Sequence, residues 1–259
     1  MPRAPNRSPP VAARVNAAVP RHGLARVLSK QGICSRSQAA EWIRAGRVAV
    51  NGRTVRDPEY PVAGVPVSLT LDGRLLESAA RVYVMLNKPR GLVVSAADEH
   101  GRDTVYGALA QAGLPWLGPV GRLDKASEGL LLLSNDTAWA AGISAPATHL
   151  DKTYHVQVDR IPDPALLGRL RDGVLDQGER LLARQVRLLR AGEKNAWLEI
   201  VLDEGRNRHI RRLLAAHGIG VLRLVRVAIG SLALGELAKG QWRHLAADEV
   251  RALRSTPEA

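Results

Sequence analysis

Hydrophobic residues recur at helical spacing near the start of the chain. Apolar side chains within residues 22–46 fall three or four positions apart in two stretches, which predicts two short helices. Ser35 and Gln38 have the spacing of a capping box, so the second helix is expected to begin there and to end at Gly46. An alternating strand then leads into Asn51–Gly52, a dipeptide typical of a tight hairpin turn. The pattern predicts a small unit of helix, helix and hairpin.

Segments of strand length dominate the chain after a predicted linker at residues 76–81. Strands are expected at residues 82–86, 92–95, 130–133, 152–158, 183–189, 196–202, 222–229 and 241–245. Helices are expected at residues 104–111, 137–143, 164–171 and 203–218, with Asp203 and Glu204 at the start of the last one. Because strands outnumber helices without regular alternation, the fold class is predicted to be α+β, with a mixed, mostly antiparallel sheet flanked by helices.

The stretch GRLDKASEGLLLLSND, residues 121–136, combines one acid in a loop with a strand that must be buried. Four consecutive leucines, Leu130 to Leu133, are typical of a strand covered on both faces. Asp124 precedes that strand, with Arg122 and Lys125 close to it in sequence. A carboxylate at the mouth of a buried strand is a candidate catalytic group. The alternative is that Asp124 only caps a turn before a core strand.

The chain is strongly basic. Its 259 residues include 37 Lys and Arg against 25 Asp and Glu, which gives a formal charge of +12 and a pI near 10.7. This balance favours a polyanionic partner, most often a nucleic acid. Residues 1–20 contain no acid and no hydrophobic period, which predicts a disordered basic tail, with an organelle transit peptide as the alternative. Aromatic residues make up only 3%, which counts against RNA binding on an open aromatic platform.

The composition gives no support to metal or membrane functions. Cys34 is the only cysteine, so the chain can form neither an internal disulfide nor a cysteine-built zinc site, and a reducing compartment is expected. The 7 histidines show no HExxH pairing, so no metal is expected. No apolar run approaches the roughly 18 residues that a membrane span needs. We therefore expect a cytoplasmic protein.

Arginines surround the predicted N-terminal unit, and only Glu41 opposes them there. The unit resembles the alpha-L RNA-binding domain shared by a small-subunit ribosomal protein and many RNA-modifying enzymes, on the strength of Ser35-Arg36, Ala39 and residues 43–52. The resemblance implies a domain at residues 21–78 whose second helix and hairpin grip structured RNA through phosphates and shape. The basic residues expected to contact RNA there are Arg36, Arg44, Arg47 and Arg53.

Four features of the remaining chain occur together: the loop Asn87–Gly91, the GRLD stretch, Lys152-Thr153-Tyr154 and the segment EGRNRHIRRLL at residues 204–214. Together they resemble the RsuA and RluB branch of the bacterial pseudouridine synthases, which modify ribosomal RNA. The resemblance implies a catalytic domain at residues 79–259 that converts a specific uridine into pseudouridine. It implies no cofactor and ribosomal RNA or a ribosome-assembly intermediate as partner, with the large subunit preferred from the form of the last motif. A monomer is expected.

The same resemblance assigns roles to individual residues. Asp124 corresponds to the essential aspartate, acting as a nucleophile on the uridine or as a base on an intermediate that retains the detached uracil. Arg211 supplies the cation that keeps Asp124 ionised in a site that excludes water, since burial alone would raise its pKa. Tyr154 is expected to stack on the base and to help move a proton.

Further positions are expected to contact RNA or to support the site. Arg122 is a candidate for holding the flipped-out region of the RNA. The cations Arg206, Arg208 and Arg212 are expected to meet phosphates. Ile210 and Leu213 are ordinary core residues in one interpretation, and in the other one of them lines the pocket against the uracil ring. Support for the catalytic loop is expected from Asn87, Lys88 and Pro89.

Some positions depart from the family pattern. Ser127 and Ser134 stand where Thr is usual, and His209 stands where Gln is common, which is expected to affect RNA contacts or substrate choice. Thr137 replaces the Gly that normally follows Asn-Asp, so the turn there must be built differently, because Thr tolerates positive φ poorly.

Two other functions compete with the synthase. A non-catalytic RNA-binding protein of ribosome assembly would keep the fold, although the presence of Asp124, Tyr154 and Arg211 argues against it. A glycoside hydrolase would need a second carboxylate, for which Glu128 or Asp136 is available. The basic charge and the alpha-L resemblance make the hydrolase a poor fit.

Overall fold

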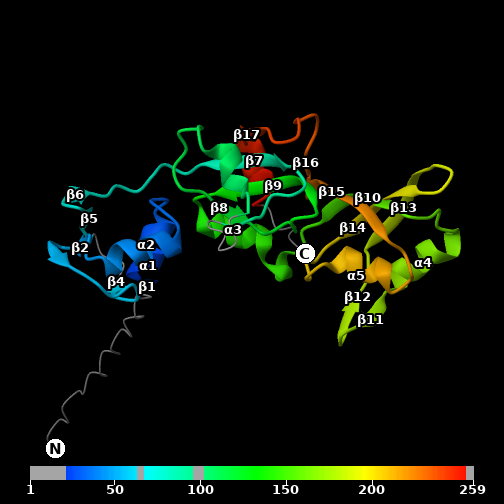
Figure 1. The fold of residues 1–259 in the computed structure, drawn as a ribbon, viewed down its shortest axis with the longest axis horizontal. Coiled ribbons are helices and arrows are strands. Elements are labelled where there is room, and N and C mark those ends of the chain that lie inside the picture. The colour runs from blue at the N-terminus through cyan, green and yellow to red at the C-terminus, as the bar shows by residue number, and fades with distance from the viewer. Residues whose placement is uncertain (1–21, 63–66, 96–101, 255–259) are drawn as a thin grey trace, which may run out of the picture.

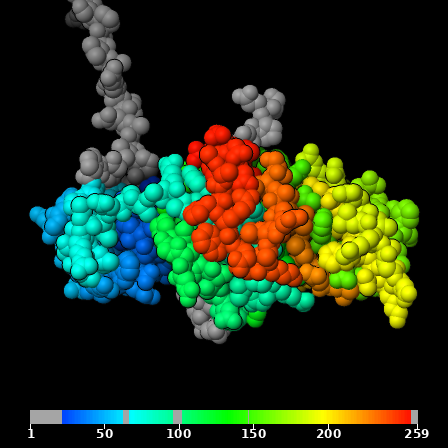
Figure 2. Space-filling model, turned by 90° about the horizontal axis from the view of Figure 1, so that it is seen from above, coloured from blue at the N-terminus to red at the C-terminus, as the bar shows by residue number. Residues whose placement is uncertain are grey.

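The computed structural model describes residues 22–62, 67–95 and 102–254. The predicted basic tail at residues 1–20 lies outside these residues. The molecule is elongated, with the N-terminal unit at one end and β13, β14 and α4 at the other (Figure 1). Seen from above, the C-terminal segment lies at the surface over the middle of the molecule (Figure 2).

The N-terminal unit packs two helices against small sheets. Its helices are α1 (Leu24–Lys30) and α2 (Arg36–Arg44). Its strands are β1 (His22–Gly23), β2 (Val48–Val50), β3 (Arg53–Thr54), β4 (Pro61–Val62), β5 (Leu69–Leu71) and β6 (Arg74–Leu75). The buried side chains form a core of their own, which includes Leu24, Leu28, Ile43 and Val48. The predicted helix, helix and hairpin are confirmed.

Local signals in the sequence account for these elements. The Ser35 hydroxyl accepts a hydrogen bond from the Gln38 amide at 3.1 Å, which caps the start of α2. Asn51 and Gly52 have φ values of 50° and 79°, as a two-residue hairpin between β2 and β3 requires. Gly46 has a φ of 73° just beyond the end of α2, a conformation that glycine adopts without strain.

The larger unit is built on one mixed sheet. Its strands follow the order β13, β14, β10, β15, β9, β7 and β17, with β16 beside β15 and β8 beside β9. They are β7 (Tyr83–Lys88), β8 (Gly118–Val120), β9 (Glu128–Ser134), β10 (Lys152–Val158), β13 (Gln185–Ala191), β14 (Ala196–Leu202), β15 (Val221–Ile229), β16 (Leu232–Ala233) and β17 (Trp242–His244). Among the described strands of this sheet only β15 and β9 pair in parallel, so the predicted mixed, mostly antiparallel sheet is confirmed.

Helices and one hairpin complete this unit. The helices are η1 (Val105–Leu109), α3 (Thr137–Ser144), η2 (Pro146–Thr148), α4 (Pro164–Asp172), α5 (His209–Ala215) and α6 (Ala247–Ala252), and the hairpin joins β11 (Val174–Asp176) to β12 (Glu179–Leu181). Two hydrophobic clusters form around the sheet. One includes Tyr154, Ile210 and Leu213, and the other includes Trp139 and Val250. The central strand β9 contributes to both clusters, because alternate leucines of Leu130–Leu133 belong to each.

The parallel junction of β9 and β15 depends on a glycine. Gly129 has a φ of 100°, and a β-carbon at this position would collide with the carbonyl oxygen of Arg226. Only glycine allows the backbones to approach this closely at that conformation. The end of β9 that follows the Asp124 loop is thereby fixed against β15.

Three predicted elements are wrong in type or extent. No strand forms at residues 92–95, where Val93 makes only an isolated bridge to Thr104. The helix predicted at residues 104–111 is a short 3-10 turn. The helix predicted from residue 203 begins only at His209, because Arg208 is left-handed with a φ of 48°. Asp203 and Glu204 therefore lie in a loop ahead of α5 and outside its first turn.

Backbone contacts join the two units. The Ala79 amide donates to the Gln31 carbonyl at 3.1 Å, and the Trp116 amide donates to the Gly32 carbonyl at 3.2 Å. Asn135 fixes the predicted linker by bonding the Ala80 carbonyl at 2.7 Å and the Val82 amide at 2.8 Å. The turn after α1 is thereby held against the start of the sheet.

Candidate active site

A cavity of about 270 Å³ opens where the Asp124 loop, β10, α5 and β15 meet. Asp124 lies in the loop between β8 and β9, and its side chain lines the cavity. The other predicted residues that line it are Arg122, Tyr154, Arg206, Arg208, Ile210 and Arg211. The tertiary structure therefore brings together residues that lie more than 80 positions apart in sequence.

A buried lysine binds the backbone of the Asp124 loop. Lys88 is fully buried at the end of β7, and its ammonium donates to the carbonyls of Asp124 at 3.2 Å, Ser127 at 2.8 Å and Pro89 at 3.1 Å. The Gly91 amide also donates to the carbonyl of Lys125 at 2.8 Å. Burial lowers the pKa of Lys88 to about 8 despite the opposing charges of Glu128 and Asp124. These contacts fit the supporting role predicted for Lys88 and Pro89.

Asn87 supports a different loop. Its side-chain amide donates to the Leu237 carbonyl at 2.6 Å, and its backbone bonds Gly240 and Gln241. Both Asn87 and Lys88 belong to β7, so the loop predicted to begin at residue 87 starts at Pro89 instead.

Asp124 itself is exposed. The expectation of a water-excluding environment is therefore wrong for the protein chain by itself, since the loop presents the carboxylate at the cavity surface. Any exclusion of water from Asp124 has to come from a bound partner that covers it.

Arg211 reaches the Asp124 loop from α5. Its guanidinium donates from Nη2 to the Ala126 carbonyl at 3.2 Å and from Nη1 to the Val221 carbonyl at 3.5 Å. Burial lowers the pKa of Arg211, and the charge of Asp124 opposes this effect, so the two groups interact electrostatically. They form no direct ion pair within the described residues. The predicted cation is thus beside the loop of Asp124, with its Nε buried and without a partner.

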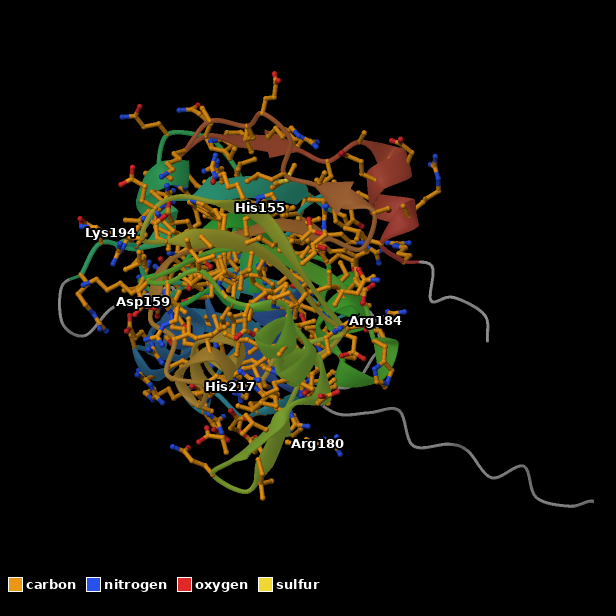
Figure 3. The ribbon with its side chains drawn as sticks, turned by 90° about the vertical axis from the view of Figure 1, so that its right-hand side faces the viewer. His155, Asp159, Arg180, Arg184, Lys194 and His217 are labelled. Carbon is orange, nitrogen blue, oxygen red and sulfur yellow. The ribbon has the colours of Figure 1, made fainter. Side chains whose placement is uncertain are left out.

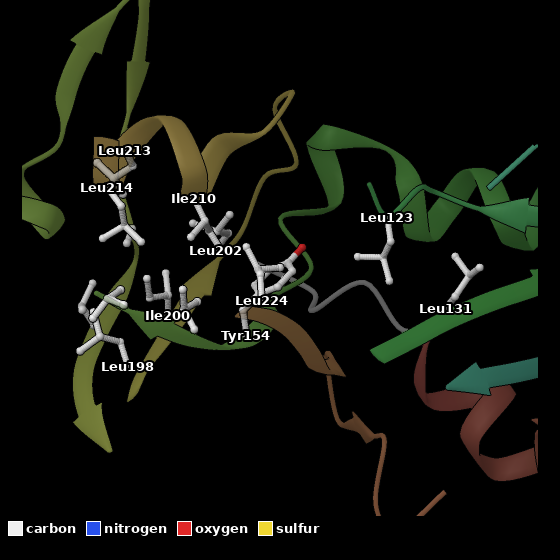
Figure 4. Packing of buried hydrophobic residues seen from close by; sticks show 14 of the residues in the cluster. Leu123, Leu131, Tyr154, Leu198, Ile200, Leu202, Ile210, Leu213, Leu214 and Leu224 are labelled. Carbon is white, nitrogen blue, oxygen red and sulfur yellow. The ribbon is translucent and has the colours of Figure 1, made fainter. Parts of the chain in front are cut away.

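Apolar side chains form one wall of the cavity. Tyr154 on β10 is 9% exposed and packs in the same cluster as Ile210 and Leu224 (Figure 4). Such a wall suits a flat base. Leu213 is fully buried and does not line the cavity, so of the two candidates for contact with uracil the geometry favours Ile210.

The predicted phosphate contacts fall into two groups. Arg208 is exposed at the cavity, and Arg206 lines it while pairing with Glu204 at 2.8 Å. Arg212 instead pairs with Asp176 at 2.6 Å and with Glu179 on the β11–β12 hairpin. These contacts give Arg212 a structural role, fastening the hairpin to α5, and engage the guanidinium that was predicted to contact phosphate.

The arginines of the N-terminal unit are exposed. Arg36 pairs with Glu59 at 3.0 Å, and Arg47 pairs with Asp72 at 2.6 Å, while Arg44 and Arg53 lie at the surface. Both ion pairs are exposed, and exposed pairs contribute little to stability.

The structure adds cavity residues to which the sequence assigned no chemistry. Lys152 and Arg226 lie on neighbouring strands and line the cavity. A basic residue in the apolar pattern of β15 was the only signal for Arg226. Nearby, buried Glu128 accepts two hydrogen bonds from Arg223 at 3.1 Å each and one from Lys239 at 2.6 Å, which anchors the end of the Asp124 loop. This carboxylate is neutralised by its partners and does not line the cavity.

The departures from the family pattern have local explanations. Asp136 caps α3 by accepting from the Trp139 amide at 3.0 Å, so Thr137 begins a helix and needs no positive φ. The Ser134 hydroxyl donates to the Val82 carbonyl at 2.7 Å. His209 is 3% exposed and lines the cavity, and burial lowers its pKa.

Positive charge dominates the cavity, which is lined by six Lys and Arg side chains and two carboxylates. Within residues 22–62, 67–95 and 102–254, no cluster of His, Cys, Asp and Glu could hold a metal ion. None of the described helices is long and apolar enough to cross a membrane.

Comparison with known proteins agrees with this geometry. A sequence model described as RNA pseudouridylate synthase matches residues 82–216, and one described as S4 domain matches residues 23–64. The chain belongs to the RNA pseudouridylate synthase family. Both resemblances drawn from the motifs are confirmed, and this pseudouridine synthase carries its S4 domain ahead of the catalytic fold.

Relatives cover most of this synthase. It is 36% identical over 236 residues to ribosomal large subunit pseudouridine synthase B of Bacillus subtilis. The aligned region covers 90% of this chain and 95% of the relative. It is 34% identical over 223 residues to an RNA pseudouridine synthase of Rickettsia prowazekii, which covers 86% and 93%. A solved pseudouridylate synthase superposes with a TM-score of 0.62 at 30% identity, which covers 90% of this chain and 99% of the other.

Proposed function

We propose that this synthase converts a specific uridine of large-subunit ribosomal RNA into pseudouridine, with Asp124 as the reacting group. The observation that carries the proposal is the position of Asp124 at a basic cavity that Tyr154, Ile210 and Arg211 also line, with Arg211 interacting electrostatically with Asp124. The large subunit is favoured because the Bacillus subtilis relative is named for it.

The reaction is an isomerisation, so its atoms balance without a co-reactant. The bond between ribose C1′ and uracil N1 breaks, a bond between C1′ and C5 forms, and the proton on C5 is lost while N1 gains one. The detached base must rotate without leaving the cavity. A cavity with one apolar wall holds a flat base through van der Waals contact and still permits that rotation.

Asp124 suits either of two roles. As a nucleophile its carboxylate attacks the uridine, and as a base it removes a proton from an intermediate that retains the free uracil. In both roles Arg211 places a positive charge beside the loop that carries Asp124. Tyr154 offers a ring for contact with the base and a hydroxyl for proton transfer.

RNA is the partner that the charge supports. The formal charge of +12 and the exposed arginines of the N-terminal unit provide attraction for phosphates along an extended surface. We retain the division into an RNA-binding domain at residues 21–78 and a catalytic domain at residues 79–259. We also retain the contacts proposed for Arg36, Arg44, Arg47 and Arg53. A monomer acting on ribosomal RNA or on an assembly intermediate remains our expectation.

Tritium release tests the catalytic proposal. Ribosomal RNA labelled at uridine C5 with tritium should release tritium with the wild-type protein and not with Asp124→Asn, which should still bind RNA. Asp172→Asn is the matched control, because Asp172 is exposed and its carboxylate has no partner within the described residues. Absence of release with wild-type protein on both ribosomal RNAs would refute the enzyme and support a non-catalytic assembly protein.

The target is tested separately. Pseudouridine mapping in ribosomal RNA from a strain lacking the gene should show the loss of a large-subunit site that the wild-type gene restores and the Asp124→Asn gene does not. Loss confined to the small-subunit RNA would contradict the proposed substrate and leave the chemistry intact.

A further inference from the structure

Two cations without an acidic partner line the cavity beside the apolar wall. Lys152 begins β10, and Arg226 lies on the adjacent strand β15. Arg226 is 5% exposed; its Nε donates to the Leu130 carbonyl at 2.8 Å, while its Nη2 is buried with no hydrogen-bond partner. Lys152 is partly buried, and its ammonium makes no hydrogen bond or ion pair within the described residues. Neither cation has the compensation that buried charges usually have.

The nearest acids are engaged elsewhere. Asp203 contacts His149 at 3.3 Å, and Asp151 pairs with Arg184 at 2.8 Å. Burial lowers the pKa of Lys152, the charge of Arg226 lowers it further, and the two aspartates oppose both effects. The folded chain therefore holds two mutually repelling cations at one cavity. A bound anion would remove this unfavourable interaction.

The cavity walls separate two environments. Near Asp124 the wall comes from the large cluster, through Leu123, Tyr154, Ile210 and Leu224. The remaining apolar lining comes from the cluster around α3, through Val120, Ile143 and Ile229. Lys152 lies two residues before Tyr154 on β10, and Arg226 is the register partner of Tyr154 on β15, so both cations adjoin the first wall. A base placed against the Tyr154 ring is neutral, so the cations beside it are available to another part of the same nucleotide.

Only one part of an RNA nucleotide is anionic, since uracil and ribose are neutral. We propose that Lys152 and Arg226 form a subsite for the backbone phosphate that adjoins the target uridine. This inference rests on the proposed function. Charge-assisted hydrogen bonds from a lysine and a guanidinium are the usual means of binding a phosphate. Fixing the phosphate sets the position of the ribose, and thus of C1′, relative to Asp124.

Lysine variants test the subsite in the full-length protein. Lys152→Met keeps the length of the side chain and removes its charge, Lys152→Arg restores the charge, and Lys194→Met is the matched control. Lys194 is exposed in the turn between β13 and β14, at the edge of the molecule (Figure 3). The measurement is kcat/KM for tritium release from labelled ribosomal RNA at several salt concentrations.

Loss of a charged hydrogen bond predicts that Lys152→Met lowers kcat/KM about 10- to 100-fold. Loss of one phosphate contact should also reduce the slope of log kcat/KM against log salt by about 0.7–0.9. Lys152→Arg should recover most of both, and Lys194→Met should match wild type. Thermal unfolding should show Lys152→Met to be at least as stable as wild type, because the repulsion with Arg226 is relieved.

Several results would overturn the subsite. An unchanged kcat/KM in Lys152→Met would do so, and so would a lower kcat/KM with an unchanged salt slope, which would place Lys152 on the base. A lower unfolding temperature without recovery in Lys152→Arg would indicate a structural role. Failure of the proposed function looks different, because wild type and Lys194→Met would then also release no tritium.

Discussion

Replacement of Lys88 by methionine separates the support of the catalytic loop from the chemistry that occurs on it. The wild-type ammonium donates to the carbonyls of Asp124, Ser127 and Pro89, and it is fully buried. Methionine fills a similar volume and donates no hydrogen bond. The three carbonyls then lose their shared donor, so the loop that carries Asp124 should become mobile.

The magnitude follows from two opposing contributions. Hydrogen bonds from a charged donor contribute about 1.5–3 kcal/mol each. Burial opposes them, because the fall in the pKa of Lys88 from 10.5 to about 8 corresponds to about 3 kcal/mol against the charged form. Three such bonds less this burial penalty lead us to expect that Lys88→Met lowers the free energy of unfolding by about 2–6 kcal/mol. Urea denaturation followed by circular dichroism measures this change, with Lys194→Met as control.

The pH dependence provides a second readout. The pKa of Lys88 is about 8 when folded and near 10.5 when unfolded, so between these values the unfolded chain binds more protons. The contribution of Lys88 to the free energy of unfolding therefore rises with pH in this window, as the penalty for burying its charge disappears. Turnover should fall above a pH of about 8, because a neutral amine holds the carbonyls less strongly. Lys88→Met should lack this inflexion.

The outcome that would refute this reasoning is specific. If Lys88→Met kept the wild-type urea midpoint, the wild-type turnover and the inflexion near pH 8, then Lys88 would not hold the loop. A loss of RNA binding at full stability would also contradict it, because the supporting role acts on the position of Asp124.

Two further predictions concern the frame of the site. Gly129→Ala should lower the free energy of unfolding by about 3–5 kcal/mol and abolish tritium release. The reason is that the new β-carbon would collide with the Arg226 carbonyl at a residue with a positive φ. A urea midpoint equal to that of wild type would contradict this prediction. Arg212→Met should lower the urea midpoint by releasing Asp176 and Glu179 from α5, while RNA affinity at fixed salt stays within twofold of wild type. A large loss of affinity with unchanged stability would restore Arg212 as a phosphate contact.

Local patterns predicted most of the framework. The alternation in Lys152–Val158 predicted the bounds of β10 correctly. The run of leucines predicted β9, because a strand buried on both faces is continuously hydrophobic. The capping signal at Ser35 and the Asn51–Gly52 turn were also correct, since both depend on neighbouring residues alone.

Errors occurred where tertiary contacts override local preference. Residues 203–208 were predicted to be helical because acidic residues precede cations and apolar residues there. In the structure Arg208 has a left-handed backbone conformation, and the segment forms a loop at the cavity. Arg212 was predicted to contact phosphate because its partners, Asp176 and Glu179, lie more than 30 residues earlier in sequence and could not be foreseen from local pattern. The hairpin that carries them has short strands with little hydrophobic alternation, so it was not predicted.

The sequence by itself determined the elements, the basic character and the residues that carry the chemistry, because helix caps, turn dipeptides, hydrophobic periods and motifs are local. Tertiary structure alone decided that Asp124 is exposed, that Arg211 reaches its loop, and that Lys152 and Arg226 share one cavity without acidic partners. These outcomes depend on how strands far apart in sequence pair and on which carboxylates reach which cations. Such distances and the dielectric around each charge are set only when the chain is packed.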